Sequence, residues 1–569
     1  MLARRGMLAG LGSALGGPLI GGCSPLAGTL RTELPPVDPG TPLTIDVHSH
    51  VFNGSDLQIA SFIKHTRPQQ AAFAGLLEQL GNFAPSAVEE LRQLDGILPT
   101  SVRAMADEQY RKARVRIGEA EARRRLAMPP PPPAMAGART PEGDLIGQRL
   151  AALPERYDNY KNELRARPRA RVAGRSGVAP APAAAAAPGC IEDDADGLFD
   201  FLLRNFHYRY VNVHDYLEEY SLRPTRKVDL MVTQIVDYDW PLGELRTDSP
   251  LRDQIRLMER ISRLTAGRVL NFAPFCPFKQ VAFNRGIGNV DDPMDLVQDA
   301  ILKRGHIGVK IYPPMGFLPY GNERLGPTYW NGTPVRGELL GRALGADLDR
   351  ALDGLYRWCL ANDVPVMAHT SPSNVAAPKY LADLMVPQSW QPVLKAYPGL
   401  RVNFAHFGHT DVVCNAGANA GLLMGLMTPG ADSPGGRLYA DSGYFAEILG
   451  DKQKVETQFR SLLLQTAGKG DAALGRRLMY GTDWEMVIIE GGTSAYLELF
   501  ESVLDDLARD SAVNPDKELT ERFFGLNAAT YLGLRRGDYN RARLDKFFGS
   551  ARPHWMAKVD KAFPAPVGL

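Results

Sequence analysis

Two histidines separated by a single residue end a short apolar stretch near the N-terminus, Thr44-Ile-Asp-Val-His48-Ser-His50. Such a stretch predicts a β-strand, and side chains two positions apart on a strand point the same way. His48 and His50 would then project together, and two neutral imidazoles so placed suit one divalent metal ion. The motif is weak alone, because His-x-His also arises by chance in loops. The hypothesis therefore depends on further ligands elsewhere in the chain.

The elements that must position these side chains are eight short, continuously apolar stretches, most of them preceded by a predicted helix. They cover residues 44–50, 228–235, 269–275, 307–311, 365–369, 401–406, 438–441 and 478–483. Apolar strands that alternate with helices are typical of a parallel sheet covered on both faces, and eight of them predict a TIM-like (β/α)8 barrel. The alternative is an open doubly wound sheet, which is weakened because no Gly-x-Gly-x-x-Gly turn follows an early strand.

Side chains that can bind a metal recur at the ends of the predicted strands. The fourth, fifth, sixth and eighth strands end at Lys310, His369, His406 and Asp483. In a barrel the C-terminal ends of all strands meet at one face. Each residue alone could be a strand cap or a hydrogen-bonded core histidine, but their recurrence at one structural position favours a site shared with His48 and His50.

These strand ends resemble the metal-dependent amidohydrolase superfamily, specifically the branch called amidohydrolase-related or amidohydrolase 2. The resemblance is carried by Ile45–His50, Gly308–Lys310, Met367–His369, Phe404–Gly408, Tyr480–Trp484 and Phe524–Leu534. It covers residues 43–63 and roughly 228–534, without the N-terminus or the long segment between. The motifs are specific for superfamily and fold but say little about the substrate.

The resemblance implies a complete site. One divalent metal would be bound by His48, His50, His369 and Asp483, with His406 beside it as general acid/base or carbonyl polariser. Three nitrogens and one carboxylate leave room for a metal-activated water, whose proton Asp483 can accept and pass to a leaving group. Asp483 and His406 would then be the catalytic residues. The donor set suits Zn²⁺ and also admits Mn²⁺ or Fe²⁺.

Lys310 leaves the number of metals open. In dinuclear members of the superfamily a strand-four lysine carries a carbamate that bridges two metals, and His369 and His406 would then bind the second one. In the branch that this chain resembles, Gly-x-Lys at this strand often belongs to mononuclear proteins, so we predict one metal per chain. His409 is expected in a loop or behind the ligands. Pocket-lining positions are expected at His214, Tyr312, Asn374, Tyr444 and Trp484.

The resemblance favours a metal-dependent hydrolase that acts on the amide, lactone or ester carbonyl of a small molecule. The alternative within the same branch is a metal-dependent decarboxylase of aromatic or enoic acids. A third hypothesis, from another class, is a non-catalytic cell-surface lipoprotein built on a barrel; the intact ligand set argues against it. With a formal net charge of +1, nothing in the composition indicates a nucleic-acid partner.

The first 23 residues resemble a twin-arginine export signal. Arg4 and Arg5 precede a glycine-rich, mildly apolar run that ends in Leu19-Ile-Gly-Gly-Cys23, a lipoprotein cleavage box. We expect Cys23 to carry a lipid that anchors the protein at the periplasmic side of a bacterial cell envelope. A transmembrane anchor is the alternative, but the run falls short of the roughly 20 residues that a span needs. No Cys-x-x-Cys occurs, so neither a disulfide framework nor a thiolate zinc site is indicated.

The chain of 569 residues is too long for one ordinary domain, and its composition divides it. Residues 24–42 are a predicted tether. Residues 43–63 and 196–534 form the barrel, separated by a mainly helical insertion at 64–195 whose Arg/Ala/Pro-rich part is predicted to be disordered. The insertion could serve as a lid, as a partner surface or as a decoration without a role. Residues 535–569 are a C-terminal extension.

Overall fold

The computed structural model describes residues 34–58, 61, 84–96, 201, 204–205, 207–221, 225–238, 240, 247–341, 343–371, 384, 386–409, 420–429, 437–490 and 493–564. The predicted signal, the first part of the tether and most of the predicted insertion lie outside the described residues. Within the described part, no helix is both long and apolar enough to cross a membrane.

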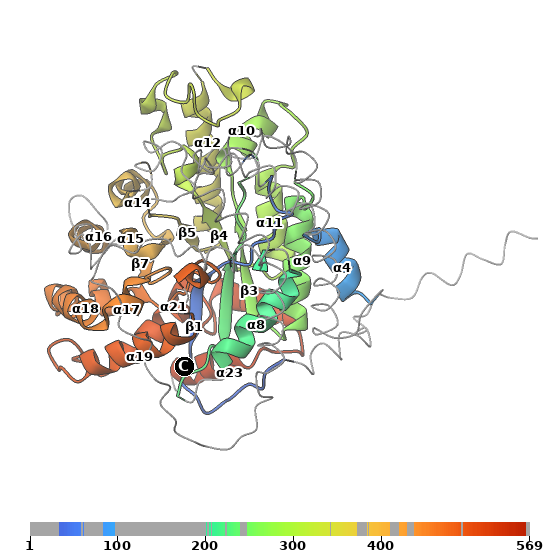
Figure 1. The fold of residues 1–569 in the computed structure, drawn as a ribbon. Coiled ribbons are helices and arrows are strands. Elements are labelled where there is room, and N and C mark those ends of the chain that lie inside the picture. The colour runs from blue at the N-terminus through green and yellow to red at the C-terminus, as the bar shows by residue number, and fades with distance from the viewer. Residues whose placement is uncertain are drawn as a thin grey trace, which may run out of the picture.

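Eight parallel strands follow one another around a barrel in chain order (Figure 1). They are β1 (Ile45–Ser49), β2 (Leu230–Gln234), β3 (Val269–Pro274), β4 (Gly308–Ile311), β5 (Val366–Ala368), β6 (Arg401–Phe404), β7 (Arg437–Asp441) and β8 (Leu478–Met479). The barrel closes where the Val47 amide donates to the Tyr480 carbonyl (3.1 Å) and Ser49 pairs in parallel with Trp484. The predicted (β/α)8 fold is confirmed.

Helices connect the strands and cover the outside of the sheet (Figure 1). Among them are α9 (Leu251–Leu264), α10 (Pro277–Asn284), α11 (Pro293–Lys303), α12 (Leu344–Ala361), α14 (Gln391–Ala396), α16 (Ala420–Met427), α18 (Lys452–Thr466) and α19 (Thr493–Ala508). Their sequences explain the packing: α12 buries Leu344, Leu348, Leu352 and Leu355, at the spacing of three to four residues that places side chains on one helix face.

One described helix of the predicted insertion, α4 (Ala87–Leu94), packs against the barrel helix α9. Ser86 caps it by accepting a hydrogen bond from the Glu89 amide, and Ala87 and Leu94 are fully buried in the main core. The buried Glu90 of α4 also pairs with Arg209, the first residue of α8 (Arg209–Ser221). This part of the insertion is therefore built into the barrel.

The C-terminal extension covers the end of the barrel where the strands begin. Its helices are α22 (Tyr539–Phe548) and α23 (Trp555–Ala562), which follow α20 (Leu519–Glu521) and α21 (Asn527–Leu532). The Trp555 indole donates to the carbonyl of Gly267, just before β3, and the Asn540 amide donates to that of Ile307, just before β4. The C-terminal ends of the strands lie at the opposite end of the barrel.

Candidate metal centre

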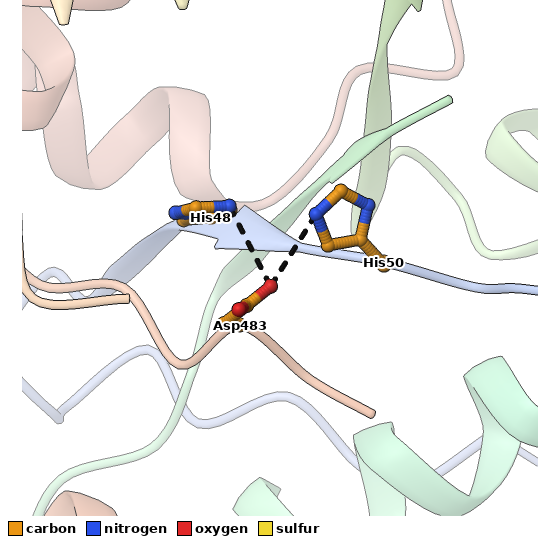
Figure 2. Close-up of side chains that lie close together, drawn as sticks. All are labelled: His48, His50 and Asp483. Atoms are coloured by element: carbon orange, nitrogen blue, oxygen red, sulfur yellow. Dashed lines mark ion pairs between the residues drawn. The ribbon is translucent and has the colours of Figure 1, made fainter. Parts of the chain in front are cut away.

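Three side chains from the two edges of the barrel seam converge on one point (Figure 2). The Nε2 atoms of His48 and His50 lie 3.5 Å and 3.3 Å from the same oxygen, Oδ1 of Asp483. All three side chains are buried, with at most 5% of any residue exposed. The structure thus brings together three of the four residues predicted to bind one metal.

The other ring nitrogen of each histidine, Nδ1, lies within hydrogen-bond distance of an oxygen atom. Nδ1 of His50 lies 2.9 Å from the Gln234 carbonyl oxygen, and Nδ1 of His48 lies 3.0 Å from Oδ1 of Asp441. A carbonyl oxygen only accepts hydrogen bonds, so His50 carries its proton on Nδ1 and turns the lone pair of Nε2 toward Asp483. Ligand histidines in metal sites are typically oriented by such a bond from the other nitrogen.

Asp483 reaches this point through an unusual backbone conformation. Its φ is 55°, in the left-handed region that aspartate tolerates better than most residues, and its amide donates to the His48 carbonyl at 2.7 Å. The buried Oδ1 atom has no hydrogen-bond donor among the described residues. Burial raises the pKa of Asp483, and burial, followed by the charge of Lys310, lowers the pKa of His48 and His50 well below the usual range.

The chemistry of these groups fits a divalent cation. With both histidines neutral, the lone pairs of two ring nitrogens and one oxygen of the Asp483 carboxyl group converge on one point. Such an arrangement is unfavourable in a dry site unless a cation lies among the three atoms. Nitrogen and carboxylate donors within 4.8 Å of one another are the donor types that bind zinc in proteins.

His369 and His406 lie beside this group and contact each other. Nε2 of His406 is 3.1 Å from Nδ1 of His369, and Nδ1 of His406 is 2.9 Å from the Gly443 carbonyl oxygen. His369 is 8% exposed, and its Nε2 has no hydrogen-bond partner among the described residues. The structure does not include His369 in the group of three, and its role as the fourth ligand stays a prediction.

Lys310 lies next to His48. Its Nζ is 3.5 Å from His48 Nε2, and the residue is 1% exposed. Within the part of the chain that the structure describes, no carboxylate oxygen lies within 4.0 Å of this ammonium group; Asp441 and Asp483 act on it from farther away. Burial lowers the pKa of Lys310. The predicted proximity of Lys310 to the ligands is therefore present in the fold.

The structure places the other residues that were predicted to line a pocket in different surroundings. The Tyr312 ring lies 4.2 Å from that of His369, and Trp484 is fully buried against Tyr216 of α8. Tyr444 has a φ of 51° at the end of β7. His214 belongs to a separate group on α8 with Asp215 and Glu218. Asn374 and the side chain of His409 lie outside the described part of the chain.

The residues that hold His48 in place were not predicted from the sequence. Asp441 was recognised only as the end of the seventh strand, although a carboxylate that ends an apolar strand is the same signal that identified Asp483. Gly443 and Gly481 were also missed. A Cβ at Gly443 would lie 2.3 Å from His48 Nδ1, and one at Gly481 would lie 2.9 Å from His48 Cβ, so only glycine leaves room for this ring.

The chain was compared with curated proteins and with solved structures. No curated protein matches the sequence. Among solved structures, an uncharacterised TIM-barrel protein from Bordetella bronchiseptica is 15% identical, with a TM-score of 0.31, covering 56% of this chain and 81% of that one. Uronate isomerase from Thermotoga maritima is 8% identical, with a TM-score of 0.35, covering 89% of this chain and 97% of that one. Similarity at this level says nothing about the reaction of this chain.

The sequence model of the amidohydrolase family matches residues 279–534. The matched segment contains Lys310, His369, His406 and Asp483, whereas His48 and His50 precede it. The match confirms that this segment has the amidohydrolase pattern predicted from the residues at its strand ends.

Proposed function

We propose that the protein is a metal-dependent hydrolase that cleaves the amide, lactone or ester bond of a small molecule with water. The observation that carries the proposal is the convergence of His48 Nε2, His50 Nε2 and Asp483 Oδ1, three buried atoms of the types that bind a divalent metal. The match of residues 279–534 to the amidohydrolase family supports it.

The residues that would hold the metal are His48, His50 and Asp483, with His369 contributing its unpartnered Nε2 as the fourth donor. A divalent metal, when bound, lowers the pKa of a coordinated water and polarises a carbonyl. We propose Zn²⁺ because three imidazoles and one carboxylate match its usual donors, while Mn²⁺ and Fe²⁺ also accept this set.

The chain's own groups would handle the protons. The other carboxylate oxygen of Asp483, Oδ2, lies 3.9 Å from Nδ1 of His406. A carboxylate so placed accepts the proton of the attacking water and returns it to the leaving group. His406, adjacent to both Asp483 and His369, would act as a general acid/base beside them. Because these side chains are at most slightly exposed, the reacting groups are shielded from bulk water.

One observation favours decarboxylation as a second candidate. Lys310 is a buried ammonium group without a carboxylate within 4.0 Å in the described residues, so it could hold the carboxylate of an acidic substrate close to the ligands. A decarboxylase would use the same site to bind an aromatic or enoic acid.

A panel assay tests the proposal. The purified chain, first stripped by a chelator and then reloaded with zinc, is given amides, lactones and esters, and in parallel aromatic and enoic acids. The proposal predicts metal-dependent hydrolysis of a member of the first set. Release of CO₂ from a member of the second set would establish the decarboxylase instead, and inactivity in both arms would favour the non-catalytic lipoprotein.

We also propose that the protein is exported and lipid-anchored through Cys23, on the basis of the paired arginines and the Leu19–Cys23 box. In cells fed radiolabelled palmitate, the wild-type chain should become labelled, whereas Cys23→Ala should not. Replacing Arg4 and Arg5 by lysine should keep the chain in the cytoplasm. Labelling of the Cys23→Ala variant would contradict the proposal.

A further inference from the structure

A single buried carboxylate forms hydrogen bonds to several residues around the candidate metal centre. Asp441, the last residue of β7, is fully buried. Its Oδ1 lies 3.0 Å from His48 Nδ1 and accepts hydrogen bonds from the backbone amides of Gly443 (2.8 Å) and His406 (3.2 Å). Its Oδ2 accepts from Nδ2 of Asn403 at 2.5 Å. The carboxylate thus connects β1, β6 and β7.

The two backbone amides determine the direction of the bond to His48. A backbone N–H group can only donate, so Oδ1 of Asp441 accepts and carries no proton, and Nδ1 of His48 must be the donor in the bond between them. The proton of His48 is therefore on Nδ1 and its lone pair is on Nε2, the atom that lies 3.5 Å from Asp483 Oδ1. Asp441 selects the tautomer that can bind a metal.

The backbone around His48 prevents the ring from turning away. Gly443 and Gly481 approach it so closely that a Cβ at either position would lie within 3 Å of a His48 atom. Gly443 is also bound to Asp441 through its amide. The Asp441 carboxylate therefore places the His48 proton on Nδ1. It also binds Gly443, one of the two glycines that fix the orientation of the ring.

Asp441 also contacts His406, the residue proposed to act on the substrate. It accepts from the backbone amide of His406, whose φ of 57° lies in the left-handed region. A non-glycine residue in that region is strained and persists only where its surroundings hold it. The hydrogen bond to Asp441 is one of the contacts that hold it.

We propose that Asp441 is a positioning residue of the metal centre, which aligns the ligand His48 and the neighbouring His406 through a single carboxylate. The inference rests on the proposed function, because it assumes that His48 Nε2 binds a metal. Removing a carboxylate that orients a ligand histidine typically weakens metal binding by about 10- to 100-fold, and that is the expected effect here.

Asp441→Asn alone changes two contacts. If the side-chain oxygen of the new asparagine still faces His48, its NH₂ group faces Asn403. The Asn403 side chain also presents its NH₂ group at this contact, so two donors face each other and no hydrogen bond forms. The double variant Asp441→Asn/Asn403→Asp restores a donor–acceptor pair at that contact while keeping the carboxylate in the cluster. It replaces the charged acceptor behind His48 by a neutral one, whose hydrogen bond is roughly half as strong. The double variant therefore weakens the positioning of His48 while the contact with residue 403 is kept.

The matched control is Asp229→Asn. Asp229 is also a buried carboxylate with three donors, the Thr44 amide, Lys558 Nζ and His554 Nε2, but it precedes β2 at the opposite end of the barrel. Its replacement should lower the thermal stability without changing the metal affinity. This variant therefore shows the effect of losing a buried carboxylate that contributes only to the stability of the fold.

The experiment measures Zn²⁺ affinity of the full chain by competition with a chromophoric chelator, the visible spectrum of the Co²⁺-loaded protein, and the melting temperature. The inference predicts that the double variant melts near the wild type yet binds Zn²⁺ about 10- to 100-fold more weakly, with an altered Co²⁺ spectrum. Affinity within about twofold of the wild type and an unchanged spectrum would overturn it. A wild-type chain that binds neither ion would instead overturn the proposed function on which it rests.

Discussion

His406 and His369 contact each other through ring nitrogens, with Nε2 of His406 3.1 Å from Nδ1 of His369. Nδ1 of His406 faces the Gly443 carbonyl oxygen at 2.9 Å, and that oxygen can only accept. Since burial holds the pKa of both rings well below the usual range, each carries one proton. His406 therefore donates from Nδ1 and accepts at Nε2, and His369 donates from Nδ1. Gly443 thereby leaves His369 with a lone pair on Nε2.

Replacing His406 by alanine should affect both the metal and the reaction. His369 loses the acceptor that fixes its tautomer, so zinc affinity should fall by about tenfold, and loss of the neighbouring catalytic group should lower kcat by about 100-fold or more. Zinc competition and steady-state kinetics measure the two effects. Tyr312→Phe, which keeps the ring against His369, is the control and should retain zinc affinity. Unchanged affinity in His406→Ala would contradict the assigned tautomers.

Asp483→Asn should abolish turnover while the fold persists. The amide preserves the shape of the side chain but cannot accept the proton of the attacking water, and it removes the only carboxylate among the three converging groups. We expect kcat to fall by at least about a thousandfold, with a smaller loss of metal. Kinetics at saturating zinc, with metal content determined on the same sample, separates the two. Wild-type turnover in this variant would disprove the proposed mechanism.

Lys310→Met tests the number of metals. An ammonium group 3.5 Å from His48 Nε2 repels a cation bound there, so its removal should tighten zinc binding, by about threefold or more, and leave one metal per chain. Isothermal titration gives both values. Two zinc ions in the wild type and one in the variant would show that Lys310 carries a bridging carbamate and that the mononuclear prediction is wrong.

A pH-dependent loss of stability should come from His306, before β4 and far along the chain from the ligands. Burial lowers the pKa of His306 to about 4, and the residue is 1% exposed. The unfolded chain, with a pKa near 6.5, takes up the proton first. The free energy of unfolding therefore falls as the pH drops from about 6.5 toward 4, with a His306 contribution of roughly 2 kcal/mol by pH 5.

Urea unfolding of the wild type and His306→Gln at pH 7.5 and pH 5 measures this contribution. The other titrating groups are common to both chains, so the difference between the two pH-induced losses isolates His306. The wild type should lose about 2 kcal/mol more than the variant. Equal losses would show that His306 is not held neutral in the folded protein.

The sequence predicts the barrel and the convergence of the three side chains because both depend on local pattern. Continuous apolar strands are recognisable one by one, and in a barrel their C-terminal ends meet whatever the loops between them do. That is enough to place His48, His50 and Asp483 at one face. The eighth strand is shorter than predicted: it ends at Met479, and the amide of the next residue, Tyr480, donates to the Phe523 carbonyl.

The supporting residues depend on contacts that no local pattern contains. Asp441 meets His48 across 393 positions in sequence, and only the closure of the barrel brings β7 so close to β1. The burial of α4 likewise requires its contact with α9, which lies beyond the long insertion. Close approaches such as that of Gly443 to His48 are set by the three-dimensional path of the backbone.

Metal content per chain tests the central claim most directly. The wild type and the His48→Ala/His50→Ala double variant are exposed to zinc, passed through a desalting column and measured by elemental analysis together with protein concentration. The account predicts about one zinc per wild-type chain and almost none in the variant, which loses two of the three converging donors. A wild type that retains no zinc, or a variant that retains as much as the wild type, would contradict the metal centre.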